Sequence, residues 1–312
     1  MHMLKKDLVS ILDWNEEEIK HLFKTAERIK NYQKTGVEFH SLKGKTLGMM
    51  FSKASTRTRV SFEVGMYQLG GYPLYLDIKA NLQVGRGETI EDTARVLSRY
   101  LDGIMIRTFS HDDVVKLAKY SSIPVINGLT DLLHPCQVLT DIFTFIEHRG
   151  DPKGANVVFI GDGNNMAHSW LNGAARCGMN LTIASPKGFE VKKDVFDAAS
   201  AVAKYNGCTL KLTNDPREAV KGADLLYTDV WASMGQEAEA KERVKKFEGF
   251  QLNRELVDLA DKDVLIMHCL PAHRGEEITD DVIDDPKHSV VFDEAENRLH
   301  LQKGILHILM TK

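Results

Sequence analysis

Short apolar runs alternate with helix-like patterns along almost the whole chain. In the first half the runs are TLGMMF, YPLYLD, GIMIRTF and IPVING. The second half repeats the pattern with NVVFIGD, NLTIASP, TLKLT, ADLLYTDVW, DVLIMHCLP and SVVFD. Strands that alternate with helices predict βαβ units, in which helices cover the faces of a parallel sheet. We therefore expect an α/β fold with two mostly parallel sheets flanked by helices.

Two helical segments divide this pattern into domains. A chain of 312 residues is long enough for two domains that each bury a core. The segment PCQVLTDIFTFIEH ends near Arg149 and Gly150 and is typical of a connecting helix. We predict one domain over residues 1–149 and a second over 150–294, joined by helices. Residues 295–312 are expected to form a helix that packs back on the first domain.

Charge, hydropathy and cysteine usage narrow the class of protein. Lys and Arg number 40 and Asp and Glu number 44, which argues against nucleic acid as the main partner. No apolar run approaches the roughly 18 residues of a membrane span, and the N-terminal stretch turns acidic before a signal-peptide core develops. Four widely separated cysteines without a CxxC pair fit a cytoplasmic protein, and their spacing from histidines predicts no metal site.

A dense group of hydroxyl and cationic side chains follows the first strand candidate. STRTR, residues 55–59, lies between a strand expected at 45–51 and a helix expected at 59–69. The first N–H groups of a helix lack intrahelical partners and the helix dipole is positive there, so this turn favours an anion. Arg57 adds a planar fork suited to phosphate. The alternative is that Ser or Thr caps the helix while both arginines are solvated.

Further polar side chains stand at the ends of the neighbouring strand candidates. Arg107 lies near the end of GIMIRTF, and His134 and Gln137 follow IPVING. Ligands of an open parallel sheet bind beyond the carboxyl ends of its strands. We therefore expect these side chains to share one anion pocket with STRTR. The alternative for His134 is a buried structural histidine.

One motif has the form of a nucleotide site without its key residues. GDGNNM, residues 161–166, follows a strand candidate and opens a helix, but Met166 stands where a third Gly or Ala belongs. The next strand ends in ASPKG and lacks the acidic residue that would hold a ribose. Nucleotide binding is the weaker interpretation, and we expect no cofactor.

Four short motifs in order carry a resemblance over essentially the full chain. STRTR, HPCQ (134–137), DVWASMG (229–235) and HCLPA (268–272) resemble the aspartate/ornithine carbamoyltransferase family. The resemblance implies an enzyme that moves the carbamoyl group of carbamoyl phosphate to an amine. It also implies L-ornithine as the acceptor and L-citrulline as the product, because Gln83 and the SMG loop match the ornithine relatives. Arg86 departs from their commonest pattern.

The resemblance also assigns roles to individual residues. Leu270 and Pro271 are expected to form a cis peptide, and QEAEAKERVKK after the SMG loop is interpreted as a solvated helix. The implied catalytic residues are Arg107, His134 and Cys269. Those implied for carbamoyl phosphate are Ser55, Thr56, Arg57, Thr58, Gln83, Arg107, His134, Gln137, Cys269, Leu270 and Arg298, and those for ornithine are Asn165, Asp229, Ser233 and Met234.

The expected chemistry has two demands. Donors around the carbonyl oxygen must stabilise its developing charge, and loss of one such donor typically costs about 100- to 1000-fold in rate. The side-chain amine of ornithine resembles lysine, so only about one molecule in a thousand is neutral at neutral pH. Either Cys269 or the leaving phosphate accepts the amine proton, and Cys269 is also compatible with an ordinary buried thiol.

Two other hypotheses remain open at this stage. One is a carbamoyltransferase for aspartate, putrescine or an acylated ornithine. The other is a noncatalytic metabolite-binding protein, which would explain the anion pocket but neither HCLPA nor the SMG loop. In the family, the loop that carries Gln83 reaches into the neighbouring subunit, so the resemblance implies a homotrimer or a multiple of trimers with shared active sites.

Overall fold

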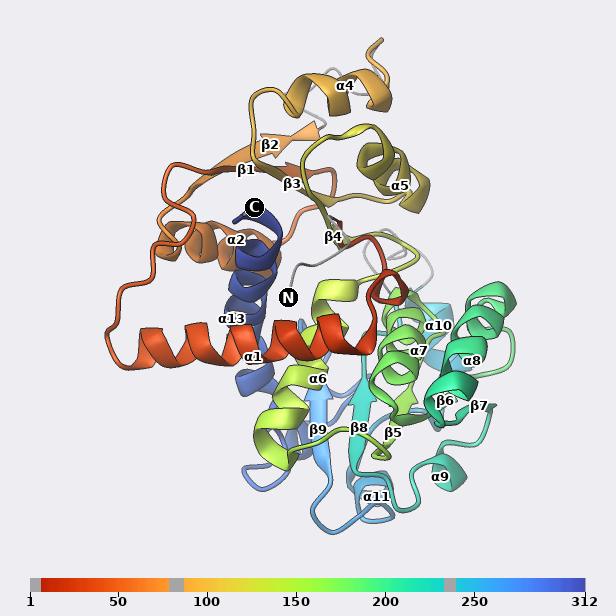
Figure 1. Cartoon of the computed structure of the whole chain (residues 1–312). Helices are drawn as coiled ribbons and strands as arrows, with labels where there is room; N and C mark the ends of the chain where they lie inside the picture. Colours follow the sequence, from red (N-terminus) through yellow and green to blue (C-terminus); the bar gives the residue numbers. More distant parts are fainter. Residues whose placement is uncertain (1–6, 79–86, 233–239, 312) are drawn as a thin grey trace. The chain divides into compact units, whose positions relative to one another are not determined.

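A computed structural model describes residues 7–78, 87–232 and 240–311, and it divides the chain into two compact units (Figure 1). The first unit takes in the chain up to Thr140 and again from Glu296, and the second unit is Asp141–Ala295. The chain passes between the units inside two long helices, α6 (Pro135–Arg149) and α13 (Val291–Met310). Each connecting helix therefore contributes residues to both units.

The first unit is built on a four-stranded parallel sheet in the order β2-β1-β3-β4. Buried side chains of α4 and α5 pack against this sheet and form one core with residues such as Met50 and Ile106. Gly65 of α2 and Gly304 of α13 allow close helix contacts, because a Cβ atom at either position would lie 3.2–3.4 Å from a neighbouring helix. The elements are η1 (Ile11–Asp13), α1 (Glu16–Lys34), β1 (Thr46–Phe51), α2 (Thr56–Gln68), β2 (Tyr72–Asp77), α4 (Ile90–Leu97), β3 (Gly103–Arg107), α5 (His111–Tyr120) and β4 (Val125–Leu129).

The second unit is built on a five-stranded parallel sheet in the order β7-β6-β5-β8-β9. One core of this unit lies around Trp231, Phe247 and Leu252 and includes side chains of β5, β8 and β9. The elements are β5 (Asn156–Ile160), α7 (Asn165–Cys177), β6 (Asn180–Ala184), α8 (Lys193–Asn206), β7 (Leu210–Thr213), α9 (Pro216–Ala219), β8 (Leu225–Thr228), α10 (Ala240–Lys246), α11 (Arg254–Val257), β9 (Leu265–His268) and α12 (Asp280–Ile283).

The predicted fold class is confirmed, since both sheets are parallel and flanked by helices. Two details of the prediction are wrong. Helix α2 begins at Thr56 rather than at residue 59, so STRTR forms its cap and first turn. SVVFD is not a strand, because only Ser289 bridges to Ile266 and α13 begins at Val291. A short apolar run does not by itself distinguish a strand from a buried helix.

In both sheets the strand order reverses direction at one point. In the first unit the chain moves from β1 to β2 on one side and then returns to β3 on the other side of β1. In the second unit β6 and β7 lie on one side of β5, and β8 lies on the other. Such a reversal opens a crevice at the carboxyl ends of the two central strands, which is where open α/β sheets bind ligands.

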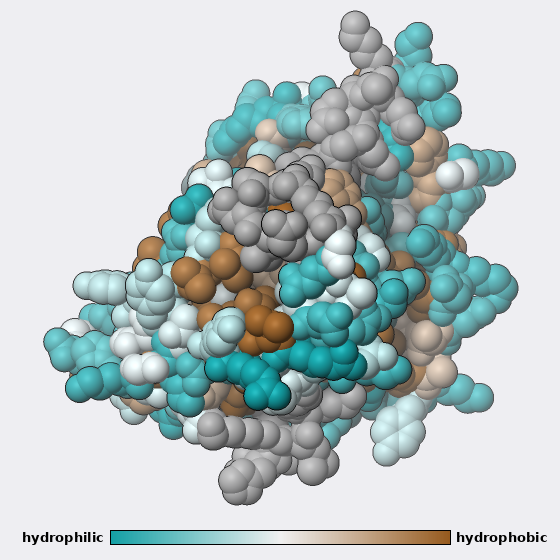
Figure 2. All heavy atoms as spheres, turned by 90° about the horizontal axis from the view of Figure 1, so that it is seen from above, coloured by the Kyte–Doolittle hydropathy of each residue, from teal (hydrophilic) through white to brown (hydrophobic). Residues whose placement is uncertain are grey.

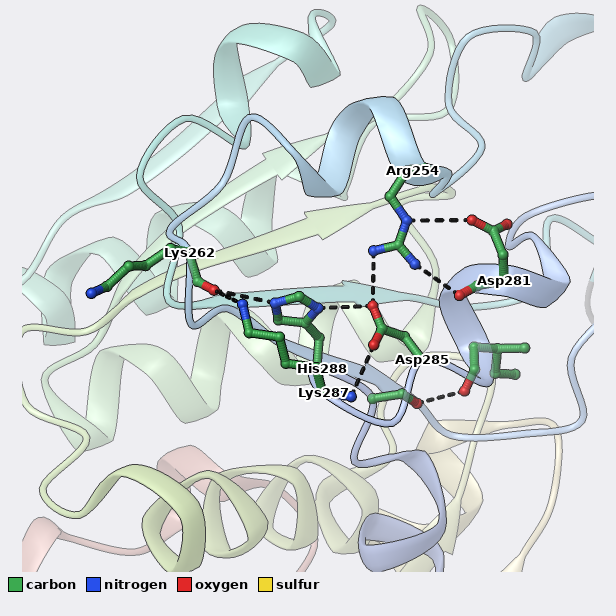
Figure 3. A network of polar contacts seen from close by, with 8 residues as sticks. Arg254, Lys262, Asp281, Asp285, Lys287 and His288 are labelled. Atoms are coloured by element: carbon green, nitrogen blue, oxygen red, sulfur yellow. Dashed lines mark hydrogen bonds and ion pairs between the residues drawn. The ribbon is translucent and has the colours of Figure 1, made fainter.

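A polar network fixes the turns around α11 and α12 in the second unit (Figure 3). The Asp285 carboxylate accepts hydrogen bonds from Arg254 Nη1 at 2.8 Å and from the Lys287 backbone N–H at 2.9 Å, and it pairs with His288 Nδ1 at 2.8 Å. Lys287 Nζ donates to the carbonyl of Lys262 at 2.8 Å. The network therefore joins α11, α12 and the turn before β9.

Polar and charged side chains cover much of the face seen in Figure 2, with apolar groups between them. Among the large apolar residues exposed in the first unit are Val60, Tyr67, Tyr72 and Tyr100. Within the ranges that the structure describes, no helix combines the length and apolar character that crossing a membrane requires.

Candidate active site

The start of α2 presents a free guanidinium beside a helix N-terminus. Ser55 is the N-cap, and its hydroxyl accepts the Thr58 N–H at 3.3 Å. Arg57 lies in the first turn, half-buried, and takes part in no hydrogen bond or ion pair among the described residues. Arg59 instead pairs with Glu63 at 3.0 Å and stacks on the Tyr75 ring at 4.0 Å. Ser55 thus caps the helix, and Arg59 lies at the surface, as the alternative interpretation of STRTR expects. Arg57, in contrast, is available to bind an anion.

Two buried guanidinium groups meet at the hydroxyl of Thr58. Its Oγ1 atom accepts a hydrogen bond from Arg298 Nη2 at 2.8 Å and one from Arg107 Nη1 at 3.4 Å. Arg298 Nη1 also donates to Oε1 of Gln137. Arg107 and Arg298 are 5% and 4% exposed, so their charges are little screened by water. Positive charge is therefore concentrated behind the first turn of α2, where it favours an anion.

This cluster forms at the reversal point of the first sheet. Thr58 follows β1 and Arg107 ends β3, and these strands are hydrogen-bonded neighbours. Gln137 lies in the first turn of α6, after β4, while Arg298 comes from α13. The predicted convergence of Thr58, Arg107 and Gln137 at one sheet edge is borne out by these contacts.

His134 is buried directly before α6 and holds a neutral ring. Burial lowers the pKa of His134 well below its usual value, and the charges of Arg298 and Arg107 lower the pKa further. Its backbone carbonyl accepts the Gln137 N–H at 3.2 Å, which ties it to the first turn of α6. A neutral imidazole close to two guanidinium groups is suited to hydrogen bonding rather than to charge pairing.

In the second unit, a buried carboxylate stands at the corresponding reversal point. Asp229 directly follows β8 and is 7% exposed. Its Oδ2 atom accepts a hydrogen bond from Asn164 Nδ2 at 3.0 Å, and Oδ1 accepts from the Val230 N–H at 2.8 Å. Cys269 Sγ donates to Oδ1 at 3.2 Å. Three donors, from the loops after β5, β8 and β9, thus fix the orientation of this carboxylate.

The thiol of Cys269 is a hydrogen-bond donor in this structure. Burial raises its pKa well above the usual value, and the nearby charges of Asp229 and Glu294 raise it further. A protonated thiol next to a carboxylate orients that carboxylate but is a poor proton acceptor. The sequence left open whether Cys269 accepts the amine proton or is an ordinary buried thiol, and it did not predict this role as a donor.

The amide that contacts Asp229 belongs to Asn164, one residue before the asparagine that the sequence selected. Asn164 is the N-cap of α7, and its Oδ1 atom accepts the N–H groups of Met166 and Ala167 at 2.8 and 3.2 Å. Asn165 is the first residue of α7. The missed signal is the preference for Asn at an N-cap, which places Asn164 at the helix start.

The second glycine of the GDGNNM motif allows close packing of two loops within the protein. A Cβ atom on Gly163 would lie 2.4 Å from the backbone of Glu190 and Val191. The position therefore requires glycine because a second loop passes close to it. Met166, at the place of the third glycine, is buried.

The stretch after the SMG loop is not simply a solvated helix, because Arg243 of α10 is only 9% exposed. Its Nη1 atom donates to Asp162 Oδ2 at 2.8 Å and to the Trp231 carbonyl at 2.9 Å. The guanidinium also lies over the Phe189 ring, 5.1 Å from its centroid. Sequence reasoning missed this residue because the charges around it gave no sign of burial.

The remaining predicted residues are only partly described. Leu270–Pro271 is a cis peptide, as predicted, and Thr56 is exposed in the first turn of α2. Four predicted positions lie outside the described residues: Gln83, Arg86, Ser233 and Met234.

The fold and these clusters define an α/β protein with a buried pair of arginines in one unit and a paired carboxylate and thiol in the other. Two family models match it: the aspartate/ornithine carbamoyltransferase carbamoyl-P binding domain over residues 6–147 and the Asp/Orn binding domain over 153–309. The chain belongs to the aspartate/ornithine carbamoyltransferase family.

Individual relatives agree with this assignment over nearly the whole chain. The ornithine carbamoyltransferase of Thermococcus kodakarensis is 56% identical over 305 residues, which cover 98% of this chain and 96% of the relative. That of Syntrophotalea carbinolica is 55% identical over 307 residues, with 98% and 100% covered. The solved structure of the ornithine carbamoyltransferase from Pyrococcus furiosus matches with a TM-score of 0.94 at 55% identity, covering 97% of this chain and 96% of that one.

Proposed function

We propose that this protein transfers the carbamoyl group of carbamoyl phosphate to the side-chain amine of L-ornithine, giving L-citrulline and phosphate. The observation that carries the proposal is the meeting of Arg107 and Arg298 at Thr58, behind the N-terminus of α2. Charge of this sign in a buried setting, next to a helix N-terminus, suits an anionic ligand such as carbamoyl phosphate. The relatives named as ornithine carbamoyltransferases support the choice of acceptor.

Carbamoyl phosphate is assigned to the first unit in two parts. Its phosphate lies at the first turn of α2, with Ser55, Thr56, Arg57 and Thr58 as donors. Its carbamoyl end lies at the buried cluster, where Arg107 and a neutral His134 stabilise the charge that develops on the carbonyl oxygen as the amine adds. The other residues assigned to this ligand by family resemblance are Gln83, Gln137, Cys269, Leu270 and Arg298.

The amino acid is assigned to the second unit. The Asp229 carboxylate is oriented by Asn164 and Cys269 and offers a partner for the α-ammonium group of ornithine. A fixed buried carboxylate repels a second carboxylate, so the same residue disfavours aspartate as the acceptor. Asn165, Ser233 and Met234 complete the ornithine assignment by family resemblance.

The proton released by the amine goes to the leaving phosphate in this proposal. Free ornithine holds its side-chain amine protonated, and selecting the neutral form costs roughly 4 kcal/mol at neutral pH. The thiol of Cys269 is already protonated and donates to Asp229, so it has no free position for that proton. The bound phosphoryl group carries two negative charges. As the C–O bond breaks, the oxygen that leaves keeps the electron pair of that bond and accepts the amine proton, so that phosphate departs as HPO4²⁻.

A panel of amines tests the proposed function. Formation of the carbamoylated product from carbamoyl phosphate is measured with ornithine, aspartate and putrescine as acceptors, by colorimetry of each product. Ornithine should be preferred in kcat/KM by at least about 1000-fold over aspartate, since the misplaced carboxylate leaves buried charges unpaired. A preference for aspartate or putrescine would overturn the assignment of the second substrate.

The active unit is proposed to be a homotrimer, or a multiple of trimers, in which the loop carrying Gln83 enters a neighbouring site. Exposed Tyr72 and Tyr100 of the first unit supply apolar surface for such contacts. Light scattering should give about three times 35.1 kDa, or a multiple of that mass. Mixed oligomers of Arg107→Ala and Gln83→Ala chains should regain activity, and confirmed mixing without any recovery would contradict shared sites.

We also place the protein in the cytoplasm. Its four cysteines are all free thiols, which is typical of proteins in a reducing compartment. Fractionation of cells followed by detection of the native protein tests this placement.

A further inference from the structure

The loop from His268 to His273, called here the 268–273 loop, is held by a fully buried carboxylate outside the site described so far. Glu277 has no exposed side-chain surface, and its Oε1 atom makes two contacts. It lies 3.1 Å from His268 Nε2 at the start of the loop and accepts the His273 N–H at 2.6 Å at the loop's end. One oxygen atom therefore joins both ends of the loop.

The hydrogen bonds assign the tautomer of His268. The Leu270 N–H donates to His268 Nδ1 at 2.9 Å, so Nδ1 carries a lone pair. The proton of the neutral ring consequently lies on Nε2, which donates it to Glu277. The His268 backbone N–H also donates to Glu294 Oε2 at 2.9 Å. Both ring nitrogens are thus engaged, and the ring has one orientation.

This chain of contacts ends on a residue with an uncommon backbone. Leu270 has a φ angle of 56°, in the left-handed region that few residues other than glycine adopt. Its N–H is held in that conformation by His268 Nδ1. Cys269, between the two, donates its thiol hydrogen to Asp229 at 3.2 Å. The direction in which the Cys269 thiol points therefore depends on the conformation of the 268–273 loop.

Glu277 is itself anchored independently of the loop. Its backbone carbonyl accepts the Leu252 N–H at 2.8 Å, and the adjacent Ile278 forms a β-bridge with Leu252. A carboxylate on a fixed backbone transmits its position to the groups that it binds. The two ends of the 268–273 loop are therefore positioned by the segment around Glu277, which makes none of the contacts to Asp229 described above.

We propose that Glu277 is a positioning residue for the reaction. It clamps both ends of the 268–273 loop and acts through His268 to hold Leu270, so that Cys269 keeps Asp229 oriented toward the amino-acid substrate. The role in catalysis rests on the proposed function, whereas the clamp itself does not. Because one oxygen atom makes both contacts, the clamp requires a hydrogen-bond acceptor at the position of Oε1 but does not require a negative charge there.

Three variants separate the clamp from charge and from general stability. Glu277→Leu removes the acceptor at similar size, while Glu277→Gln keeps one oxygen that accepts both hydrogen bonds. Glu276→Leu is the matched control, since that neighbour is 45% exposed and its carboxylate lies 3.5 Å from the His273 ring. If Glu277→Leu does not fold, Glu277→Asp replaces it, because the shorter side chain no longer reaches both donors.

The first readout is alkylation of the Cys269 thiol by iodoacetamide, followed by mass spectrometry of the Cys269 peptide. Without the clamp, the rate should rise at least about tenfold, which corresponds to the loss of roughly one hydrogen bond to a charged group. Glu277→Gln and Glu276→Leu should stay within about threefold of the parent protein. This readout needs no substrate, so it tests the clamp even if the proposed function fails.

The second readout separates the two substrates. Without the clamp, kcat/KM for ornithine should fall at least about tenfold. The Kd of a methylene phosphonate analogue of carbamoyl phosphate should rise by less than about threefold, because most of the residues assigned to this ligand lie in the first unit. Glu277→Leu with parental alkylation and parental kcat/KM, and only a lower Tm, would overturn the proposal. Equal losses in Glu277→Gln and Glu277→Leu would overturn it as well, since charge would then be what matters.

Discussion

Replacing Arg57 by methionine is expected to weaken phosphate binding far more than the same replacement at Arg59. The two arginines lie two positions apart on α2 in different surroundings. Arg57 has no hydrogen-bond or ion-pair partner among the described residues, whereas Arg59 pairs with Glu63 and stacks on Tyr75. Only Arg57 is therefore free to bind a phosphate group at the helix N-terminus.

The magnitude follows from the contacts that Arg57 would make. A guanidinium fork donates two charge-assisted hydrogen bonds to a phosphate, each worth about 1.5–3 kcal/mol. Because a water molecule partly replaces the lost donors, we take a net loss of about 3 kcal/mol, or roughly 100-fold in Kd. Loss of the exposed pair of Arg59 with Glu63 costs less than about 1 kcal/mol of stability. It should leave Kd within about twofold.

Calorimetric titration with the methylene phosphonate analogue of carbamoyl phosphate measures both variants at one ionic strength. Arg57→Lys serves as a second control, since it keeps the charge and loses the fork, and it should give an intermediate Kd. Thermal unfolding shows that each variant is folded. A Kd for Arg57→Met within threefold of the parent, or equal effects at both positions, would refute the phosphate assignment.

Three further predictions concern the Cys269 thiol, the stability of the protein in acid, and the network around α11. Cys269→Ser keeps a donor to Asp229 and should retain at least about tenfold more kcat/KM for ornithine than Cys269→Ala, whereas equal losses would contradict the donor role. Burial and the charge of Lys303 lower the pKa of His300 to about 4, so the unfolded chain binds this proton at a higher pH than the folded protein does. Stability should therefore fall as the pH drops from 6.5 toward 4, and His300→Gln should flatten this dependence by at most about 1.4 kcal/mol per pH unit in urea unfolding; identical slopes would count against it. Burial alone would raise the pKa of Asp285, but hydrogen bonds from His288 and Arg254 hold it below its usual range (Figure 3). Asp285→Asn should lower the free energy of unfolding by about 1–3 kcal/mol at pH 7, and this difference from the parent protein should shrink as the pH falls through the pKa of Asp285 in the folded protein. The control is Asp281→Asn, because the Asp281 side chain is 59% exposed.

The strands were predictable because buried parallel strands are apolar throughout and are bounded by polar turns. TLGMMF and NVVFIGD contain β1 and β5 for this reason. SVVFD has the same composition, yet Val291 begins α13. Val290 and Val291 are buried whereas Phe292 is 66% exposed, and a run of five residues carries no period that reveals the start of a helix.

The anion cluster was only partly predictable. Thr58 and Arg107 follow neighbouring strands, so topology alone predicts that they meet. Arg298 is 240 positions from Thr58 and reaches it only because α13 packs within the first unit. The family motif located Arg298, but no local pattern predicts its contact with Thr58 or with Gln137.

The second site shows what local sequence cannot resolve. Asn164 and Asn165 have the same side chain, and only the position of the helix start decides which of them contacts Asp229. The role of the Cys269 thiol depends on burial and on charges from distant segments. Glu277 looked like one of two acidic residues in a polar loop, because burial of a carboxylate is a property of the fold rather than of its neighbours in sequence.

A crystal structure of the protein with the methylene phosphonate analogue tests the central claim most directly. The account predicts phosphonate oxygens within about 3 Å of the Arg57 guanidinium and the first backbone N–H groups of α2, with the carbonyl oxygen beside Arg107. Phosphonate bound anywhere else in the first unit, without contact to Arg57, would contradict it.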